Sequence, residues 1–246
     1  MSRRLKVLLA VGVVLVVVVG GGLWWFFKDD APDEVSLDDA VAQVEDASDA
    51  PDTTDTTADE ASAIEGTWTI DTQTGDFDLE SATGTFAGYR VEEELATIGS
   101  NTAVGRTGDV TGSFTIEGTT VTDADFEVDL TGLTSDEGLR DGRAQDALET
   151  SQFPTATFTL TEPIELGDGA TSDQGVAVDA TGDLTIHGVT NSVELPLEAR
   201  LVDDTVVLVG SLDFALSDFD IDVPTTPIAL SISDQGTFEL QFLLTR

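Results

Sequence analysis

His187 is the residue that most invites a chemical role, because it is the only histidine in the chain and lies in the segment LTIHGVT. An isolated imidazole can act as a general base or a metal ligand. The chain has no second histidine and no cysteine, so neither a His-rich metal site nor a Cys–His pair can be built. We therefore predict a structural role, in which the imidazole forms a hydrogen bond at a hairpin turn.

Carboxylates offer a second kind of chemistry. Asp218, Asp220 and Asp222 alternate with apolar residues, so in a strand they would share one face as a calcium patch or an acid pair. The spacing of an EF-hand loop is absent, and an acidic solvent-facing surface is the simpler interpretation in such an acidic chain. The same interpretation applies to 92–94 (EEE). The sequence predicts no metal site.

Arginine is scarce, which draws attention to Arg90, Arg106 and Arg140, with Arg143 close to the last of them. Each could clamp a loop by pairing with a carboxylate. No nucleophile elbow, phosphate-binding loop or dinucleotide-binding glycine motif is present. We therefore assign no catalytic residue and no cofactor.

The net charge of −38 excludes some partners. Beyond Lys28 the chain carries all 48 acidic residues against six arginines and no lysine. Such a surface repels phosphates, which argues against nucleic-acid binding. The lack of cysteine also excludes disulfides, a thiol nucleophile and an acylated N-terminal cysteine.

The N-terminus predicts a membrane anchor. Residues 7–27 are uncharged and as a helix would span roughly 32 Å, the thickness of the hydrocarbon core. Three basic residues precede the run, so the N-terminus is expected in the cytoplasm and the rest of the chain outside it, in a single-pass arrangement. A cleaved signal peptide is the alternative, although no A-x-A site follows. Residues 1–28 thus form a cytoplasmic stub and anchor.

Residues 29–65 predict an acidic disordered tether. They contain fourteen acidic residues, no basic residue and no aromatic residue. Such a composition buries too little apolar surface to offset the entropy of ordering. Within the tether, 36–44 (SLDDAVAQV) starts with a potential N-cap serine and could form a transient helix.

Residues 66–246 predict a single all-β domain. Apolar and polar residues alternate at 126–130 and at 238–244, as expected for strands with one buried face. Roughly eight antiparallel strands fit between the recurrent turn signals. The polar segment 134–153 breaks the pattern and predicts one short helix, with Ser135 as its N-cap.

Three stretches of this domain together resemble the YceI-like family of lipocalin-like polyisoprenoid-binding proteins. They are 151–160 (SQFPTATFTL), 181–199 (TGDLTIHGVTNSVELPLEA) and 212–224 (LDFALSDFDIDVP). The segment 88–116 resembles the variant found in membrane-anchored actinobacterial members. One departure is Asp220, where the family usually has glycine.

The resemblance implies an extended eight-stranded antiparallel barrel whose apolar tunnel holds a long isoprenoid chain. It implies non-catalytic binding, transport or storage of such a lipid, with no cofactor, and members often pair as homodimers. Arg90, Arg106 and Arg140 are the candidates for contact with a lipid headgroup. The candidate ligand-binding residues are Phe86, Tyr89, Val91, Phe114, Phe126, Phe158, Ile186, Leu195, Leu208 and Phe238.

Two other functions fit the same residues. The barrel could be a ligand-free extracytoplasmic stress or interaction protein, because inward aromatic residues can simply fill the interior. It could also be a lipid-modifying enzyme, whose turnover would then depend on His187 or an aspartate.

Overall fold

The computed structural model describes residues 31–47, 64–96, 99–167, 175–223 and 229–246. The predicted anchor at 7–27 and much of the predicted tether lie outside the described residues. Among the helices that are described, none combines the length and the apolar character that a membrane crossing requires.

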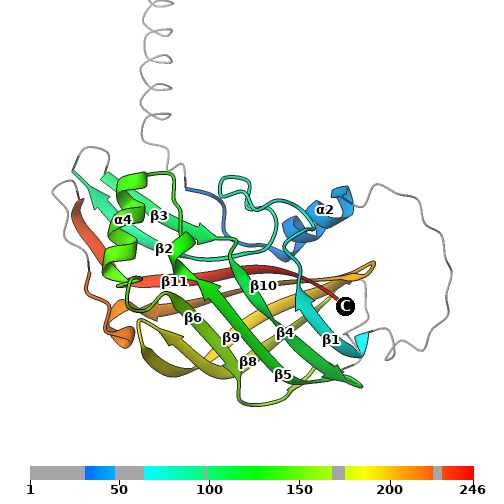
Figure 1. Ribbon diagram of the computed structural model, residues 1–246. Coiled ribbons are helices and arrows are strands. Elements are labelled where there is room, and N and C mark those ends of the chain that lie inside the picture. Colours follow the sequence, from blue (N-terminus) through cyan, green and yellow to red (C-terminus); the bar gives the residue numbers. More distant parts are fainter. Residues whose placement is uncertain (1–30, 48–63, 97–98, 168–174, 224–228) are drawn as a thin grey trace, which may run out of the picture.

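The described strands form one antiparallel sheet that closes on itself (Figure 1). Eight of them form the ring in the order β1-β4-β5-β6-β8-β9-β10-β11, and β11 returns to β1 through the pairs Thr69↔Thr245 and Ile70↔Leu244. The β2–β3 hairpin extends the sheet from β11, and the short β7 pairs with β5. The predicted eight-stranded antiparallel barrel is confirmed. The strands are β1 Gly66–Ile70, β2 Phe86–Leu95, β3 Gly99–Thr107, β4 Val110–Glu117, β5 Thr120–Asp129, β6 Thr155–Leu160, β7 Ile164–Glu165, β8 Val176–Ile186, β9 Val189–Val202, β10 Thr205–Ala215 and β11 Ala229–Thr245.

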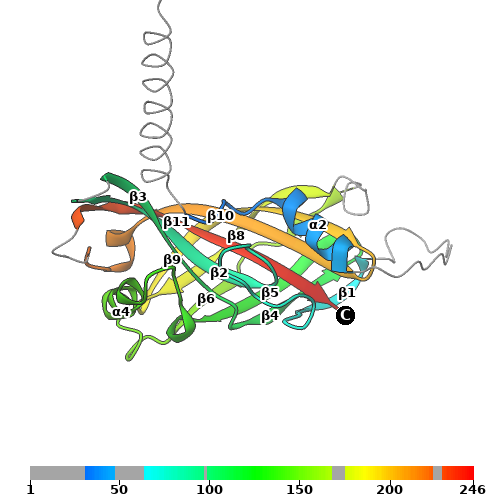
Figure 2. The ribbon, with the colours of Figure 1, turned by 90° about the horizontal axis from the view of Figure 1, so that it is seen from above.

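Helix α2 (Leu37–Ala47) packs on the outside of the barrel, against β9 and β10 (Figure 2). Its buried residues Leu37, Ala40, Val41 and Val44 meet an apolar patch on the outer face of the sheet. This part of the predicted tether is therefore ordered. The reason is the spacing of those four side chains, which forms one apolar helix face despite the acidic composition around it. The barrel side of the contact is Val202, Val207, Val209 and Leu243.

Helix α4 (Gly138–Ala147) lies at one end of the barrel, inside the segment predicted to be helical (Figure 1). Its N-cap is Glu137 and not Ser135. The backbone nitrogen and the hydroxyl of Ser135 instead donate to the Asp141 carboxylate, at 2.7 and 2.6 Å. Ser135 thus fixes the start of α4 from outside the helix.

The prediction that three aspartates share a strand face is wrong. A 3₁₀ turn, η3 (Leu216–Phe219), replaces the strand, and Asp220 ends it in the left-handed conformation with φ of 54°. Glycine favours that conformation, which gives a physical reason for the family's usual residue at this position. Another 3₁₀ turn, η1 (Leu130–Gly132), links β5 to the segment before α4.

Candidate ligand cavity

A cavity of about 440 Å³ occupies the barrel interior. Strands β2 to β11 contribute to its lining, and α4 covers one end of it. The volume falls within the range of small-molecule sites, about 300–1,000 Å³. The lining is formed mainly by valine, leucine, isoleucine, alanine and phenylalanine, so the cavity suits an apolar ligand.

Nine of the ten predicted ligand-binding residues line this cavity. Phe86 does not, because it lies on the outer face of β2, where the Arg106 guanidinium stacks 4.6 Å from its ring centroid. Successive strand residues point to opposite faces, so Phe86 and Tyr89, three positions apart, cannot both point inward. Strict alternation within β2 would have revealed this from the sequence. The nine lining residues are Tyr89, Val91, Phe114, Phe126, Phe158, Ile186, Leu195, Leu208 and Phe238.

Small residues leave room for the cavity inside the barrel. They are absent from the predicted ligand-binding residues, which are mostly large side chains. Ala124, Ala156, Ala180 and Gly210 all line the cavity. Ala180 is only 1% exposed and sits at an inward position of β8, where a larger side chain would enter the cavity. The alternation of inward and outward residues along each strand could have identified them, because it places these small residues on the same inward face as the large ones.

Phenylalanines pack together toward the η3 side of the barrel. The rings of Phe214 and Phe238 stack with centroids 3.5 Å apart, and Phe219 contacts both rings edge-on. This cluster and the cavity share Phe214 and Phe238, so part of the aromatic surface is packed core and part is cavity wall.

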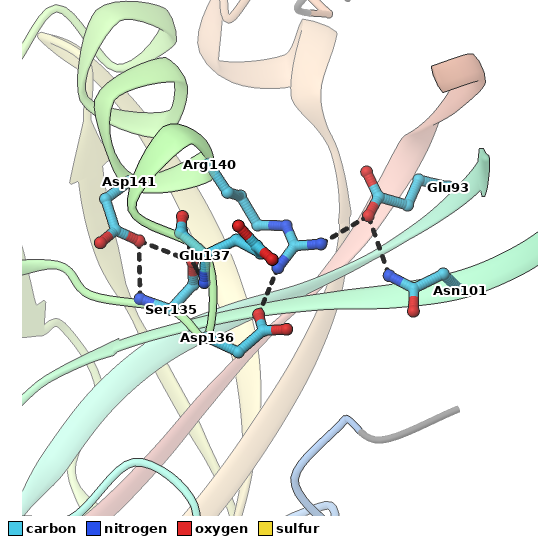
Figure 3. A network of polar contacts seen from close by, with 7 residues as sticks. All are labelled: Glu93, Asn101, Ser135, Asp136, Glu137, Arg140 and Asp141. Carbon is cyan, nitrogen blue, oxygen red and sulfur yellow. Dashed lines mark hydrogen bonds and ion pairs between the residues drawn. The ribbon is translucent and has the colours of Figure 1, made fainter. Parts of the chain in front are cut away.

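Polar side chains enter the lining at the end covered by α4. We call Tyr89, Glu93, Arg140 and Arg143 the α4 end of the cavity. Figure 3 shows that Arg140 reaches from α4 to Glu93 of β2, with Nη2 2.7 Å from Oε1. The same oxygen accepts a hydrogen bond of 2.9 Å from Asn101 of β3. The contact ties α4 to the β2–β3 hairpin.

Arg140 also forms an ion pair with Asp136 at the start of the helix. Burial alone would lower the pKa of Arg140, but its hydrogen bond to Glu93 and the charges of Asp136 and Glu93 raise that pKa overall. Arg140 is therefore a charged group that is already shared between two carboxylates.

Tyr89 lines the cavity together with residues of α4, and the charge of Arg140 acts on its phenol. Its ring covers Gly105 of β3, where a Cβ atom would come within 2.5 Å of the ring. Burial raises the pKa of Tyr89 to about 12, with a smaller opposing effect of the Arg140 charge. The phenol is therefore neutral at physiological pH and able to donate a hydrogen bond.

Arg90 and Arg106 are not at the α4 end, in contrast to their proposed role in headgroup contact. Both lie on the outer face of the barrel, since they occupy outward positions of β2 and β3. Arg106 is completely buried, with Nε 2.6 Å from Glu239 Oε1 and Nη2 donating to the Asp33 carbonyl oxygen at 2.9 Å. Arg90 pairs with the same carboxylate at 3.5 Å. These arginines form a carboxylate clamp that attaches the segment before α2.

His187 lies in the β8–β9 hairpin turn with a positive φ of 53°. Its Nδ1 is 3.1 Å from the carbonyl oxygen of Phe219, and its ring meets Phe153 edge-on. The imidazole thus bonds η3 and not its own turn. Over the described ranges, no group of three or more His, Asp or Glu side chains is placed to hold a metal ion.

Comparisons with known proteins place this fold and cavity in a family. The family model described as YceI-like domain matches residues 68–244. A UPF0312 protein of Vibrio parahaemolyticus is 30% identical over 142 residues, covering 53% of this chain and 70% of that protein. A UPF0312 protein of Pseudomonas aeruginosa is 32% identical over 157 residues, covering 58% and 75%.

Two solved structures share the fold. A polyisoprenoid-binding domain from Saccharophagus degradans superimposes with a TM-score of 0.53 at 18% identity, over 74% of this chain and 98% of that domain. BcnA of Burkholderia cenocepacia gives a TM-score of 0.51 at 16% identity, over 64% and 95%. The family model spans almost the whole barrel, and the chain therefore belongs to the YceI-like family.

Proposed function

We propose that this protein binds an apolar isoprenoid-type lipid inside its barrel, without catalysis, on the outer face of the cell membrane. The observation that carries the proposal is the apolar cavity inside the closed sheet. The structural likeness to a domain described as polyisoprenoid-binding supports this choice of ligand.

The energetics favour a long hydrocarbon chain. A prenyl tail that buries about 400 Å² of apolar area gains roughly 10 kcal/mol before the costs of ordering and association. Unbranched or isoprenoid chains present no polar groups that the apolar lining would leave unsatisfied. The cavity therefore has the surface needed to hold such a tail against water.

The predicted anchor would keep the lipid-binding barrel at the membrane. Attached through residues 7–27, the barrel would remain at the membrane in which its ligand dissolves, and it could exchange lipid without leaving the surface. This arrangement is compatible with storage of the lipid and with its transfer. Homodimer formation stays a prediction.

Native mass spectrometry of the full chain, released from detergent, tests the proposal. We expect a stoichiometric isoprenoid species that organic extraction releases for identification. Ala180→Phe places a large ring inside the cavity and should sharply reduce the bound mass. Ala177→Phe is the matched control, because it places the same side chain at an exposed position of the same strand and should retain the lipid.

Thermal unfolding of both variants separates loss of ligand from loss of fold. An empty wild-type chain that also rejects added isoprenoids would contradict lipid binding and would favour a scaffold that binds protein partners. Conversion of the bound lipid to a product would favour an enzyme. The same spectra report whether the chain is a monomer or a homodimer.

A further inference from the structure

Exposed apolar side chains gather at one end of the barrel. Among the described residues, the large hydrophobic side chains that face solvent are Leu139 at 72%, Leu230 at 71% and Val223 at 36% exposed. Leu139 belongs to α4, Leu230 to the start of β11, and Val223 follows η3. Figure 1 and Figure 2 place α4, η3 and the start of β11 at the same end of the barrel. Single exposed leucines are common on protein surfaces, whereas a group at one end indicates an interaction surface.

Helix α4 and the start of β11 meet at the end of β2. Arg140 of α4 binds Glu93 of β2 at 2.7 Å. Two residues further along β2, Leu95 pairs with Ala229, the first residue of β11. The two exposed leucines are the chain neighbours of Arg140 and Ala229, so they belong to the same part of the molecule.

The cavity opens at this end. Leu139 lines the cavity, although most of its side chain is exposed, so the cavity reaches the surface beside α4. Leu95 of β2 and Ile232 of β11 line the cavity as well. A lipid that leaves the cavity here would pass the exposed Leu139.

The segment that leads to the predicted anchor is attached close to α4. The carbonyl oxygen of Asp33 accepts a hydrogen bond of 2.9 Å from Arg106. The backbone of Arg106 pairs in turn with Thr134, which lies shortly before α4. Residues 28–30 separate the predicted anchor from Ala31, a connection of at most about 14 Å when extended. The bilayer is therefore expected within short reach of this end.

We propose that the surface formed by Leu139, Val223 and Leu230 docks on the bilayer that holds the anchor, and that the bound lipid enters and leaves the cavity through it. This inference rests on the proposed function, from which it takes the apolar ligand and the anchor. It adds the surface that meets the membrane and the route of the lipid.

The anchor makes a small docking surface sufficient. Three apolar side chains bury too little area to hold a free protein tightly on a membrane. A tethered domain needs less, because docking is then intramolecular and the surface has a high effective concentration next to the bilayer. Weak docking also lets the barrel detach after it has taken up a lipid.

The carboxylates around this surface determine which bilayer it fits. An anionic bilayer would repel them, whereas a zwitterionic bilayer would not. Salt screens such repulsion between exposed charges, with a screening length of about 8 Å at physiological ionic strength. The proposed partner is therefore a zwitterionic lipid surface. The exposed acidic residues on the elements at this end include Glu92, Glu94, Glu137, Asp146 and Asp222.

Labels at single positions test the docking, because the chain has no cysteine of its own. The full chain is reconstituted in phosphatidylcholine vesicles that contain lipids with a nitroxide quencher near the headgroup. We expect fluorescent labels on Leu139→Cys and on Leu230→Cys to lose most of their intensity. The control is a label on Asp204→Cys, in the exposed β9–β10 turn at the far end of β9 from η3, which should lose little.

Leu230 allows a test of the lipid route, because it does not line the cavity. Leu230→Ser removes part of the docking surface and leaves the ligand site intact. Transfer of a fluorescent isoprenoid from the vesicle into the barrel should slow several-fold, with no change in the amount bound at equilibrium. Asp204→Ser is the control and should leave the transfer rate unchanged.

Unquenched labels at positions 139 and 230 of an anchored chain would overturn the inference, while mass spectrometry would still decide lipid binding independently. Disulfide formation between two Leu139→Cys chains in place of quenching would assign the surface to a second copy and also overturn it. Stronger quenching in phosphatidylglycerol vesicles at low salt would contradict the choice of a zwitterionic surface. A chain that does not associate with vesicles would contradict the anchor and this inference together.

Discussion

Two half-buried polar side chains, His187 and Tyr89, lie in different surroundings in the barrel. His187 forms its hydrogen bond to Phe219, a residue far away in the chain, so the imidazole joins two turns at one end of the barrel. Tyr89 lines the cavity, and burial raises the pKa of its phenol. The second ring nitrogen of His187, the buried Nε2, lies 3.6 Å from Glu149 Oε2 and has no hydrogen-bond partner among the described residues.

Tyr89 can be observed directly, because it is the only tyrosine in the chain. Burial raises its pKa to about 12, so a titration of phenolate absorbance should show a midpoint near that value in the folded protein. The unfolded chain releases the same proton near pH 10. Between these two pH values only the folded state keeps the proton, so the free energy of unfolding should fall as the pH rises through this window.

The Tyr89→Phe variant serves as the control for this titration. Tyr89→Phe should remove the absorbance change altogether and remove this contribution to the pH dependence of unfolding. A midpoint near 10 in the folded wild type would place the phenol in water and would contradict its burial.

At the scale of elements, α4 behaves as a cover held by few contacts. None of its residues is fully buried. Its polar links to the rest of the fold include the contact of Arg140 with Glu93 (Figure 3) and a hydrogen bond of 3.1 Å from Gln145 Nε2 to the Thr131 carbonyl oxygen. Gly138 and Gly142 have no neighbouring atoms where a Cβ would lie, so they add backbone freedom without a packing role. We therefore expect that α4 can move away from the barrel end without disturbing the sheet.

We predict that Glu93→Gln accelerates release of a bound lipid several-fold, because it removes the charge that holds Arg140 across the cavity end. Stopped-flow transfer of a fluorescent isoprenoid to acceptor vesicles measures the rate. Asp146→Asn is the control, since it removes one negative charge from an exposed position of α4. Equal release rates in wild type and Glu93→Gln would show that α4 does not limit exit.

At the scale of the whole molecule, the segment before the barrel is part of the fold. The carbonyl oxygen of Asp33 accepts hydrogen bonds from Arg90 and Arg106, and α2 then covers apolar residues on the outer face of β9 and β10. The described residues begin at Ala31, close in sequence to the end of the predicted anchor at Phe27. The short connection would hold the barrel near the membrane surface.

We predict that Val41→Asp detaches α2, because it places a charge on the buried helix face and forfeits about 1.5–3 kcal/mol of apolar burial. Hydrogen exchange of 37–47 should become fast, and the free energy of unfolding should fall by a similar amount. Ala42→Asp adds the same charge on the exposed face and should change neither. Retained protection in Val41→Asp would mean that α2 does not depend on this contact.

Local patterns in the sequence were enough to predict the class of the fold and most of the cavity wall. Alternating apolar residues define which face of each strand is buried, and this local rule holds wherever a strand is regular, as at Phe126 and Phe238. The rule would also have excluded Phe86. The short helix at the barrel end followed from an equally local break in the pattern.

Contacts between residues distant in the chain could be found only from the three-dimensional fold. The pairing of Arg106 with Glu239, of Arg140 with Glu93, and of α2 with the outer face of β10 each joins segments that no local pattern connects. The acidic composition around α2 concealed its apolar face, because composition averages over a stretch while packing depends on spacing. The size of the cavity was likewise set by where alanine and glycine meet across the barrel, which is a property of the closed sheet and not of any one strand.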